Sequence, residues 1–327
     1  MNYDALPLPA SAYGRRLYAR GRTLVADHGL RLDEVMWDAD EVLWDWLLQG
    51  VRLAGGLWRA VLLKNYAHTE YIAARPGMFE LLWGMRHEAL ERGDDPDVRI
   101  WTSGYAWRVW RISRQIPGLS ELLGLPANAD AATYAKAGTF FSRPDFARAA
   151  LMLVNARVPE GLLAHASDAS KAVITRHLDD KLTSALKVPD LAALVGKDGF
   201  GRVRILVDDL QTNIDRFVET GRLGVHVVSH APRIVFGAVP NSVWGRPGTH
   251  LARPAPDHAN AVADALEEAL ATGGSGVFRA EPPVGPVTEV PAPFKLGIPN
   301  ARVQAGLSQP IRDLRTAMRM QARRSRL

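Results

Sequence analysis

Short apolar runs of strand length alternate along the chain with longer segments in which apolar residues recur at helical spacing. The apolar runs are Val35–Trp37, Val98–Trp101, Arg202–Val207 and Val225–Val228. Helical spacing follows two of them, over residues 78–90 and 105–116. Alternating strands and helices are typical of a parallel sheet with helical crossovers. The pattern therefore predicts an α/β fold with a Rossmann-like open parallel sheet, and it places functional residues beyond the carboxyl ends of the strands.

The same pattern divides the chain into a core and several additions. We expect the core over residues 35–229, with a helix-compatible apolar run at 41–63 and a mostly helical insertion at about 105–186. Residues 1–34 predict one basic helix packed beside the core as an extension. Residues 230–309 are rich in Pro and Gly and predict an irregular extension with one helix at 257–272. Residues 310–327 predict a basic amphipathic tail helix.

Composition changes this picture in two ways. The chain has 327 residues and no Cys, which excludes disulfides, cysteine nucleophiles and thiolate zinc sites and favours carboxylate and hydroxyl chemistry. The net charge of +5 is contributed by residues 310–327, which contain six Arg and one acid, Asp313. The rest of the chain is neutral. The tail is a candidate docking site for an acidic partner, nucleic acid or a membrane surface, and a merely solvated basic tail is the alternative.

Targeting signals are not evident in the sequence. No apolar run reaches the length of a membrane span, and the N-terminus lacks the basic-then-apolar pattern of a signal peptide. We therefore expect a folded, soluble protein without a transmembrane segment, located in the cytoplasm.

Carboxylates directly follow two of the predicted strands. Asp38 and Asp40 come after the first strand, and Asp208 and Asp209 come after the strand that ends at Val207. Acids held close together at a strand end are costly without a cation. The pair of Asp38 and Asp40 thus indicates a Mg2+ site or a coupled acid and base, and a solvated turn is the alternative.

A hydroxyl pair follows another strand. Thr102 and Ser103 precede the helix expected at 105–116, so they form either an anion cradle or an ordinary helix N-cap. The histidine spacing of His226 and His230 carries little weight as a metal signal, because no carboxylates accompany it in a helical context.

The order of these residues is more specific than any one of them. The acid pair, the hydroxyl, a lysine and the closing acid pair together resemble the four motifs of the haloacid dehalogenase-like (HAD) superfamily. The matching residues are Asp38, Asp40, Thr102, Lys187, Asp208, Asp209 and Asn213. A receiver domain also combines acids, a hydroxyl and a lysine, but its lysine comes last, whereas this series closes on an acid pair.

The resemblance extends beyond single residues. Arg75-Pro76-Gly77 is similar to the Arg-Pro-Gly helix start of the superfamily, and Val207–Asn213 is similar to its Val-Asp-Asp-x-x-x-Asn variant. The window Lys187–Asp209 is similar to the branch of C-terminal-domain protein phosphatases. The motifs cover about residues 35–228.

The resemblance implies a HAD-like core and a Mg2+-dependent phosphatase that forms an aspartyl phosphate. Asp38 is then the nucleophile and Asp40 the proton donor, with Thr102, Ser103 and Lys187 on the phosphoryl oxygens. The implied Mg2+ ligands are Asp38, Asp208 or Asp209, and the backbone carbonyl of Asp40, with Asn213 in support. Lys171 or Lys181 could replace Lys187, and Ser103 could replace Thr102.

One departure concerns Glu41. The superfamily commonly has Gly-Thr or a similar pair after the second acid, whereas this chain has Glu41-Val42, which adds a negative charge near the expected phosphate site. The substrate could be a small metabolite, a phosphoprotein or a nucleic-acid end, and we expect the helical insertion to shape access to the site. The alternative from another class is an inactive HAD-like binding or scaffold protein.

Overall fold

The structure is a computed structural model. It describes residues 9, 11–46, 48–52, 58–62, 70–102, 104–142, 144–145, 192, 195–228, 234–236, 257–282, 294–296 and 316.

A six-stranded parallel sheet forms the centre of the described part of the chain. In sheet order its strands are β11 (Gly276–Ala280), β9 (Leu223–Val227), β8 (Ile205–Asp208), β1 (Val35–Trp37), β6 (Arg99–Trp101) and β7 (Phe140–Phe141). Every neighbouring pair is parallel. The predicted α/β fold with a Rossmann-like open parallel sheet is confirmed. The strand predicted from Arg202 begins later, because Asp198–Arg202 forms a 3-10 helix.

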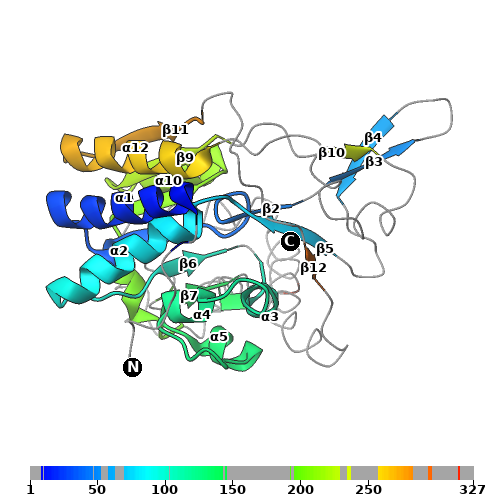
Figure 1. The fold of residues 1–327 in the computed structure, drawn as a ribbon, viewed down its shortest axis with the longest axis horizontal. Helices are drawn as coiled ribbons and strands as arrows, with labels where there is room; N and C mark the ends of the chain where they lie inside the picture. Colours follow the sequence, from blue (N-terminus) through cyan, green and yellow to red (C-terminus); the bar gives the residue numbers. More distant parts are fainter. Residues whose placement is uncertain are drawn as a thin grey trace, which may run out of the picture.

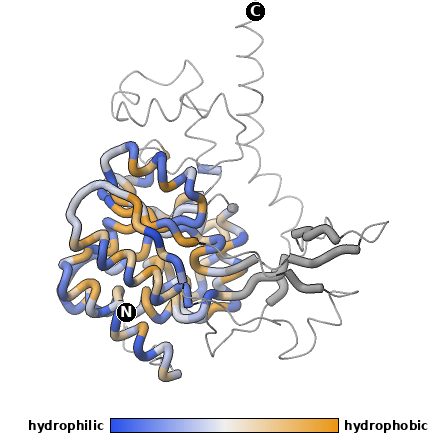
Figure 2. The backbone as a smooth tube through the Cα atoms, turned by 90° about the horizontal axis from the view of Figure 1, so that it is seen from above, coloured by the Kyte–Doolittle hydropathy of each residue, from blue (hydrophilic) through white to orange (hydrophobic). Residues whose placement is uncertain are grey.

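The central strands are buried along their whole length because both faces of the sheet are covered. Every residue of β1, β6 and β8 is buried, including Asp208 at the end of β8. Period-two alternation is therefore absent from these strands, as expected for a covered parallel sheet. Figure 2 shows hydrophobic and hydrophilic positions alternating along the helices that surround them.

Three long helices lie side by side against the sheet (Figure 1). They are α1 (Ala12–His28), α2 (Met78–Arg92) and α12 (His258–Thr272). Glycines let α1 and α2 approach closely: a Cβ atom on Gly21 would lie 2.1 Å from the Leu81 carbonyl oxygen, and one on Gly84 would lie 1.9 Å from that of Tyr18. Any larger residue at either glycine would force the helices apart.

The N-terminal extension is part of the main hydrophobic core. Leu17, Leu24 and Val25 of α1 are buried in the same cluster as Val35 of β1. The hydroxyl of Tyr13 donates a hydrogen bond to Asp257, which caps α12, at 2.5 Å. Burial and this carboxylate both raise the pKa of Tyr13. The helix of residues 1–34 is thus tied to an element more than 200 residues away.

The sheet also continues past residue 229, where sequence analysis ended the core. β11 lies within the range expected to be an irregular extension, yet it pairs with β9 from Gly276 to Ala280. Its side chains alternate in burial because it is the edge strand of the sheet, so it lacks the continuous apolar run that identifies the inner strands.

The helix expected at 41–63 is wrong. These residues form β2 (Trp44–Trp46), β3 (Leu48–Arg52) and β4 (Trp58–Leu62). β2 pairs antiparallel with β5 (Glu70–Ala74), β3 pairs with β4, and β10 (Ile234–Phe236) and β12 (Phe294–Leu296) complete two three-stranded sheets. Trp, Val and Leu suit a strand as well as a helix, so spacing alone did not separate the two.

The predicted insertion is described only in its first part. It contains α3 (Ala106–Ser113), α4 (Leu119–Leu122), α5 (Ala131–Lys136) and the short strand β7. Of the tail at 310–327, only Thr316 lies among the described residues. Within the described helices, none combines the length and apolarity that crossing a membrane requires.

Candidate functional site

The strands that carry the predicted motifs are neighbours at the centre of the sheet. β1 pairs with β8 on one side and with β6 on the other. The register places Trp37 opposite both Val207 and Ile100. Asp38 and Asp208 therefore leave the sheet at the same level, and Thr102 leaves it one residue further along. All three lie at the carboxyl edge, where open parallel sheets form their sites.

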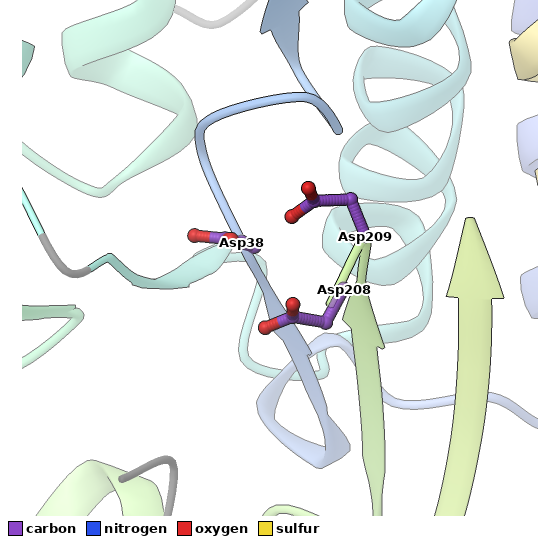
Figure 3. A group of neighbouring side chains, drawn as sticks. All are labelled: Asp38, Asp208 and Asp209. Atoms are coloured by element: carbon purple, nitrogen blue, oxygen red, sulfur yellow. The ribbon is translucent and has the colours of Figure 1, made fainter. Parts of the chain in front are cut away.

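Three carboxylates converge at this edge (Figure 3). Oxygen atoms of Asp38, Asp208 and Asp209 all lie within 4.8 Å of one another. Asp38 is 5% exposed and Asp208 is fully buried. Three negative charges this close are mutually repulsive, and a shared divalent cation removes the repulsion.

Backbone and amide groups hold two of these carboxylates in place. The Ala39 amide donates a hydrogen bond to Asp38 Oδ1 at 2.7 Å. The Leu210 amide donates to Asp208 Oδ1 at 2.8 Å, and Asn213 Nδ2 lies 3.3 Å and 3.2 Å from the two Asp208 oxygens. Asn213 is the fifth residue after Asp208, in the first turn of α10 (Gln211–Val218). It therefore stands where a supporting residue was predicted.

Asp40 lies apart from this group of three. Its carboxylate accepts two hydrogen bonds from the Arg108 guanidinium, with Nη1 to Oδ2 at 3.0 Å and Nη2 to Oδ1 at 2.8 Å. The Trp44 indole nitrogen also donates to Asp40 Oδ1, at 2.7 Å. Among the described residues, the carboxylates placed to share a cation do not include that of Asp40. The backbone carbonyl of Asp40, which the resemblance implied as a Mg2+ ligand, is not engaged by these side-chain contacts.

Glu41 occupies an unusual backbone position. It is the one described residue other than glycine with positive φ, at 59°. Its amide donates to the Trp44 carbonyl oxygen at 2.8 Å, and its carboxylate lies 3.4 Å from Nη2 of the buried Arg75. The left-handed conformation is the one that glycine adopts freely. A glycine would adopt this conformation without strain, whereas the Glu that stands here has a partner in Arg75.

Thr102 is buried and does not cap the following helix. Its Oγ1 accepts a hydrogen bond from the Gly104 amide at 2.9 Å, which closes a tight turn. The N-cap of α3 is Tyr105, which makes no side-chain cap hydrogen bond. The ordinary N-cap interpretation of Thr102 is therefore wrong, and the hydroxyl proton of Thr102 can be donated to a bound oxyanion.

The remaining predicted phosphate ligands lie outside the described residues: Ser103, Lys187, and the alternatives Lys171 and Lys181. Lys197, which the structure does describe, follows Lys187 by ten residues in the sequence. It is buried and its ammonium group contacts other residues. Its Nζ lies 3.0 Å from Asp145 Oδ2, 2.6 Å from the Phe140 carbonyl oxygen and 2.9 Å from that of Ala135. These contacts anchor the segment before β8 to the segment around β7.

Sequence reasoning missed Arg108. It lies in the first turn of α3, and helical side chains point back towards the helix N-terminus, which brings the guanidinium to the site. A cation in the first turn is disfavoured by the helix dipole, so an Arg six residues after Thr102 was a usable signal for an anionic partner.

No family model matches the chain, and neither a curated protein nor a solved structure matches it.

Proposed function

We propose that the protein is a HAD-like, Mg2+-dependent phosphohydrolase that acts through an aspartyl phosphate on Asp38. The observation that carries the proposal is the convergence of Asp38, Asp208 and Asp209 at the carboxyl ends of two adjacent parallel strands. Thr102 at the end of the third adjacent strand supports it. The order of these residues matches the HAD motifs, and the sheet supplies the proximity that such chemistry requires.

The residues present fit a magnesium ion. The donor set consists of carboxylate oxygens, which Mg2+ prefers, and Asp209 is partly exposed, which leaves room for retained waters. Asp38, Asp208 and Asp209 would hold the ion. When bound, it would neutralise charge that develops on the phosphoryl oxygens.

The residues of the chain then divide the reaction between them. A carboxylate oxygen of Asp38 attacks phosphorus while the bond from phosphorus to the leaving oxygen breaks. Asp40, released from Arg108 and protonated from solvent, gives that proton to the leaving oxygen. In the second half, Asp40 takes a proton from a water molecule that attacks the aspartyl phosphate, which releases inorganic phosphate and restores both acids. Thr102 donates its hydroxyl proton to a phosphoryl oxygen, and Asn213 keeps Asp208 oriented.

An inactive HAD-like binding or scaffold protein is the second candidate. The observation that favours it is the contact between Asp40 and Arg108, because both oxygens of the proposed proton donor are engaged. The first candidate nevertheless accounts for more of the site, since a scaffold has no need for three converging carboxylates.

Hydrolysis of an aryl phosphate, with Mg2+ or with EDTA, separates the two. We expect Mg2+-dependent release of phosphate by the wild-type protein, and a loss of at least about a thousandfold in the Asp38→Asn variant. Asp27→Asn is the matched control, because Asp27 is an exposed acid on α1. Activity that survives EDTA or Asp38→Asn would sink the mechanism. Absence of turnover across a broad panel of phosphate esters would favour the scaffold.

The identity of the motif lysine can be settled in the same assay. We expect Lys187→Ala to abolish turnover, whereas Lys171→Ala and Lys181→Ala should retain it. The reverse pattern would reassign the lysine without affecting the role of Asp38.

A further inference from the structure

Arg108 occupies a position in the site that the proposed chemistry leaves unused. Its side chain is 10% exposed, and its guanidinium contacts Asp40 through two nitrogens. Burying a guanidinium in the first turn of a helix is unfavourable both for desolvation and for the helix dipole. The carboxylate of Asp40 offsets both costs in this structure, so the position is built around a bound carboxylate.

The guanidinium also reaches the turn that follows β6. A Cβ atom on Gly104 would lie 3.0 Å from Arg108 Nη1 and 3.2 Å from Thr102 Oγ1. Arg108 therefore extends from Asp40, beyond β1, to the Thr102–Gly104 turn. The guanidinium thus lies between the hydroxyl of Thr102, proposed to bind the phosphoryl group, and Asp40, the proposed proton donor.

The contact with Asp40 fixes which part of a substrate would meet Arg108. In the proposed reaction Asp40 faces the leaving oxygen, because it must hand a proton to it. A cation that binds both oxygens of Asp40 consequently lies beside the leaving group. Its planar fork already holds one carboxylate in two-point geometry, which shows that a carboxylate fits there.

We infer that Arg108 is a specificity-determining residue that binds a carboxylate carried by the leaving group, so that the preferred substrates are phosphate monoesters of hydroxy acids. This inference rests on the proposed function. The carboxylate of the substrate replaces that of Asp40 on the guanidinium, and the Trp44 indole, still hydrogen-bonded to Asp40 Oδ1, keeps Asp40 at the leaving oxygen.

The charges around the site support this selectivity. Asp38, Asp208 and Asp209 lie at the same edge and repel an additional carboxylate. Arg108 is a cation that offsets this repulsion beside Asp40, on the leaving-group side. A neutral leaving group has no carboxylate that could replace the Asp40 carboxylate on the Arg108 guanidinium. A leaving group that carries a carboxylate can make an equivalent two-point contact.

The test compares phenyl phosphate with 3-carboxyphenyl phosphate in the presence of Mg2+. The meta carboxylate cannot reach the phosphorus to assist intramolecularly. We expect the wild-type protein to prefer the carboxylated ester by roughly tenfold to a hundredfold in kcat/KM, as for a charge-assisted pair. Arg108→Gln should bring that ratio close to one, and Arg108→Lys should leave it between the two. Because a repositioned Asp40 lowers kcat/KM for both esters alike, the ratio of the two kcat/KM values is insensitive to that general loss of activity.

Arg111→Gln is the matched control, because Arg111 lies on the same helix and stacks over the ring of Trp110 with its Cζ 5.5 Å from the ring centroid. It should keep the wild-type preference. Circular dichroism checks folding, and Arg108→Lys carries the test if Arg108→Gln does not fold.

Three results would overturn the inference. A wild-type ratio near one, with Mg2+-dependent hydrolysis of both esters, refutes it and leaves the proposed function standing. An undiminished ratio in Arg108→Gln does the same. Absence of hydrolysis of either ester, together with absence of turnover across the broad panel of phosphate esters, refutes the proposed function, and the inference falls with it.

Discussion

The carboxylate of Glu41 lies 3.4 Å from the guanidinium of Arg75, and Glu41 itself has a positive φ of 59°. Arg75 is 2% exposed and belongs to the Arg-Pro-Gly segment that begins α2. The turn after Asp40 is thus joined to the start of the next helix by an ion pair and by a backbone hydrogen bond from the Arg75 amide to the Leu43 carbonyl oxygen, at 2.9 Å. An acid next to a proposed phosphate site is compatible with anion binding here because its charge is turned towards Arg75.

Substitutions at Glu41 should separate backbone strain from the ion pair. Glu41→Ala and Glu41→Gly both remove the carboxylate, but only glycine adopts positive φ without strain. We expect Glu41→Gly to be more stable than Glu41→Ala by about 1 kcal/mol, measured by urea unfolding. Glu41→Gln keeps the length of the side chain and should cost about 1 kcal/mol relative to wild type, because the buried Arg75 loses a charged acceptor. Equal stability of the Ala and Gly variants would contradict the strained backbone.

Much of the sheet could be predicted from sequence because its inner strands are covered on both faces. The strands β1 and β8 read as unbroken apolar runs that stop at acids, and this is why Asp38 and Asp208 were found together. The edge strand β11 has no such run, since alternate residues face solvent. The segment 41–63 contains residues that favour a strand or a helix equally, so neither the local pairing of β3 with β4 nor the pairing of β2 with the more distant β5 could be predicted from spacing.

The candidate site was predictable where residues follow strands directly or lie at a motif spacing from a strand end, as Asn213 does. Asp38, Thr102 and Asp208 needed only strand ends and their order. Arg108 depends instead on how α3 is placed against the turn beyond β1. Its place in the first turn of a helix signals an anionic partner, but only the tertiary arrangement identifies that partner as Asp40. The engagement of Asp40 by Arg108 was missed for the same reason.

Thr102 is expected to serve both the turn and the substrate. Thr102→Val removes the oxygen that accepts from the buried Gly104 amide, so the variant should lose about 1 to 3 kcal/mol of stability and most of its turnover. Thr102→Ser keeps the hydroxyl and should retain both within about tenfold in kcat/KM. Thermal unfolding and aryl phosphate hydrolysis report the two effects separately. A fully active Thr102→Val variant would exclude the hydroxyl from phosphoryl binding.

Asn213 is expected to act on the metal through Asp208. It donates to both oxygens of Asp208 and holds them towards the other carboxylates. Asn213→Ala should raise the Mg2+ concentration for half-maximal activity by roughly tenfold to a hundredfold, and excess Mg2+ should restore much of the rate. Gln211→Ala is the control, because Gln211 lies on the same helix but bonds Asp215 at the surface. An unchanged Mg2+ requirement in Asn213→Ala would show that Asp208 is oriented without it.

Asp33 should make stability depend on pH in the acid range. It is fully buried immediately before β1, and burial alone would raise its pKa, but hydrogen bonds from Arg31 and Arg202 outweigh burial and lower the pKa. Because the folded state holds Asp33 ionised more strongly than the unfolded state, its contribution is present above the unfolded pKa of about 3.9 and is lost as pH falls towards the lower folded value. Asp33→Asn should therefore cost about 1 to 2 kcal/mol at pH 6, discounted for the exposure of both arginines.

The difference between wild type and Asp33→Asn should shrink as urea unfolding is repeated at pH 6, 4 and 3, since protonation gradually removes in the wild type the charge that the variant already lacks. Asp27→Asn provides the reference for an exposed acid, and its difference from wild type should stay within about 0.5 kcal/mol at every pH. Because Asp33 joins the segment before β1 to Arg202 ahead of β8, its loss also loosens the two strands that carry the carboxylates. A constant difference across this pH range would mean that the arginines stabilise the segment by packing and not through the charge of Asp33.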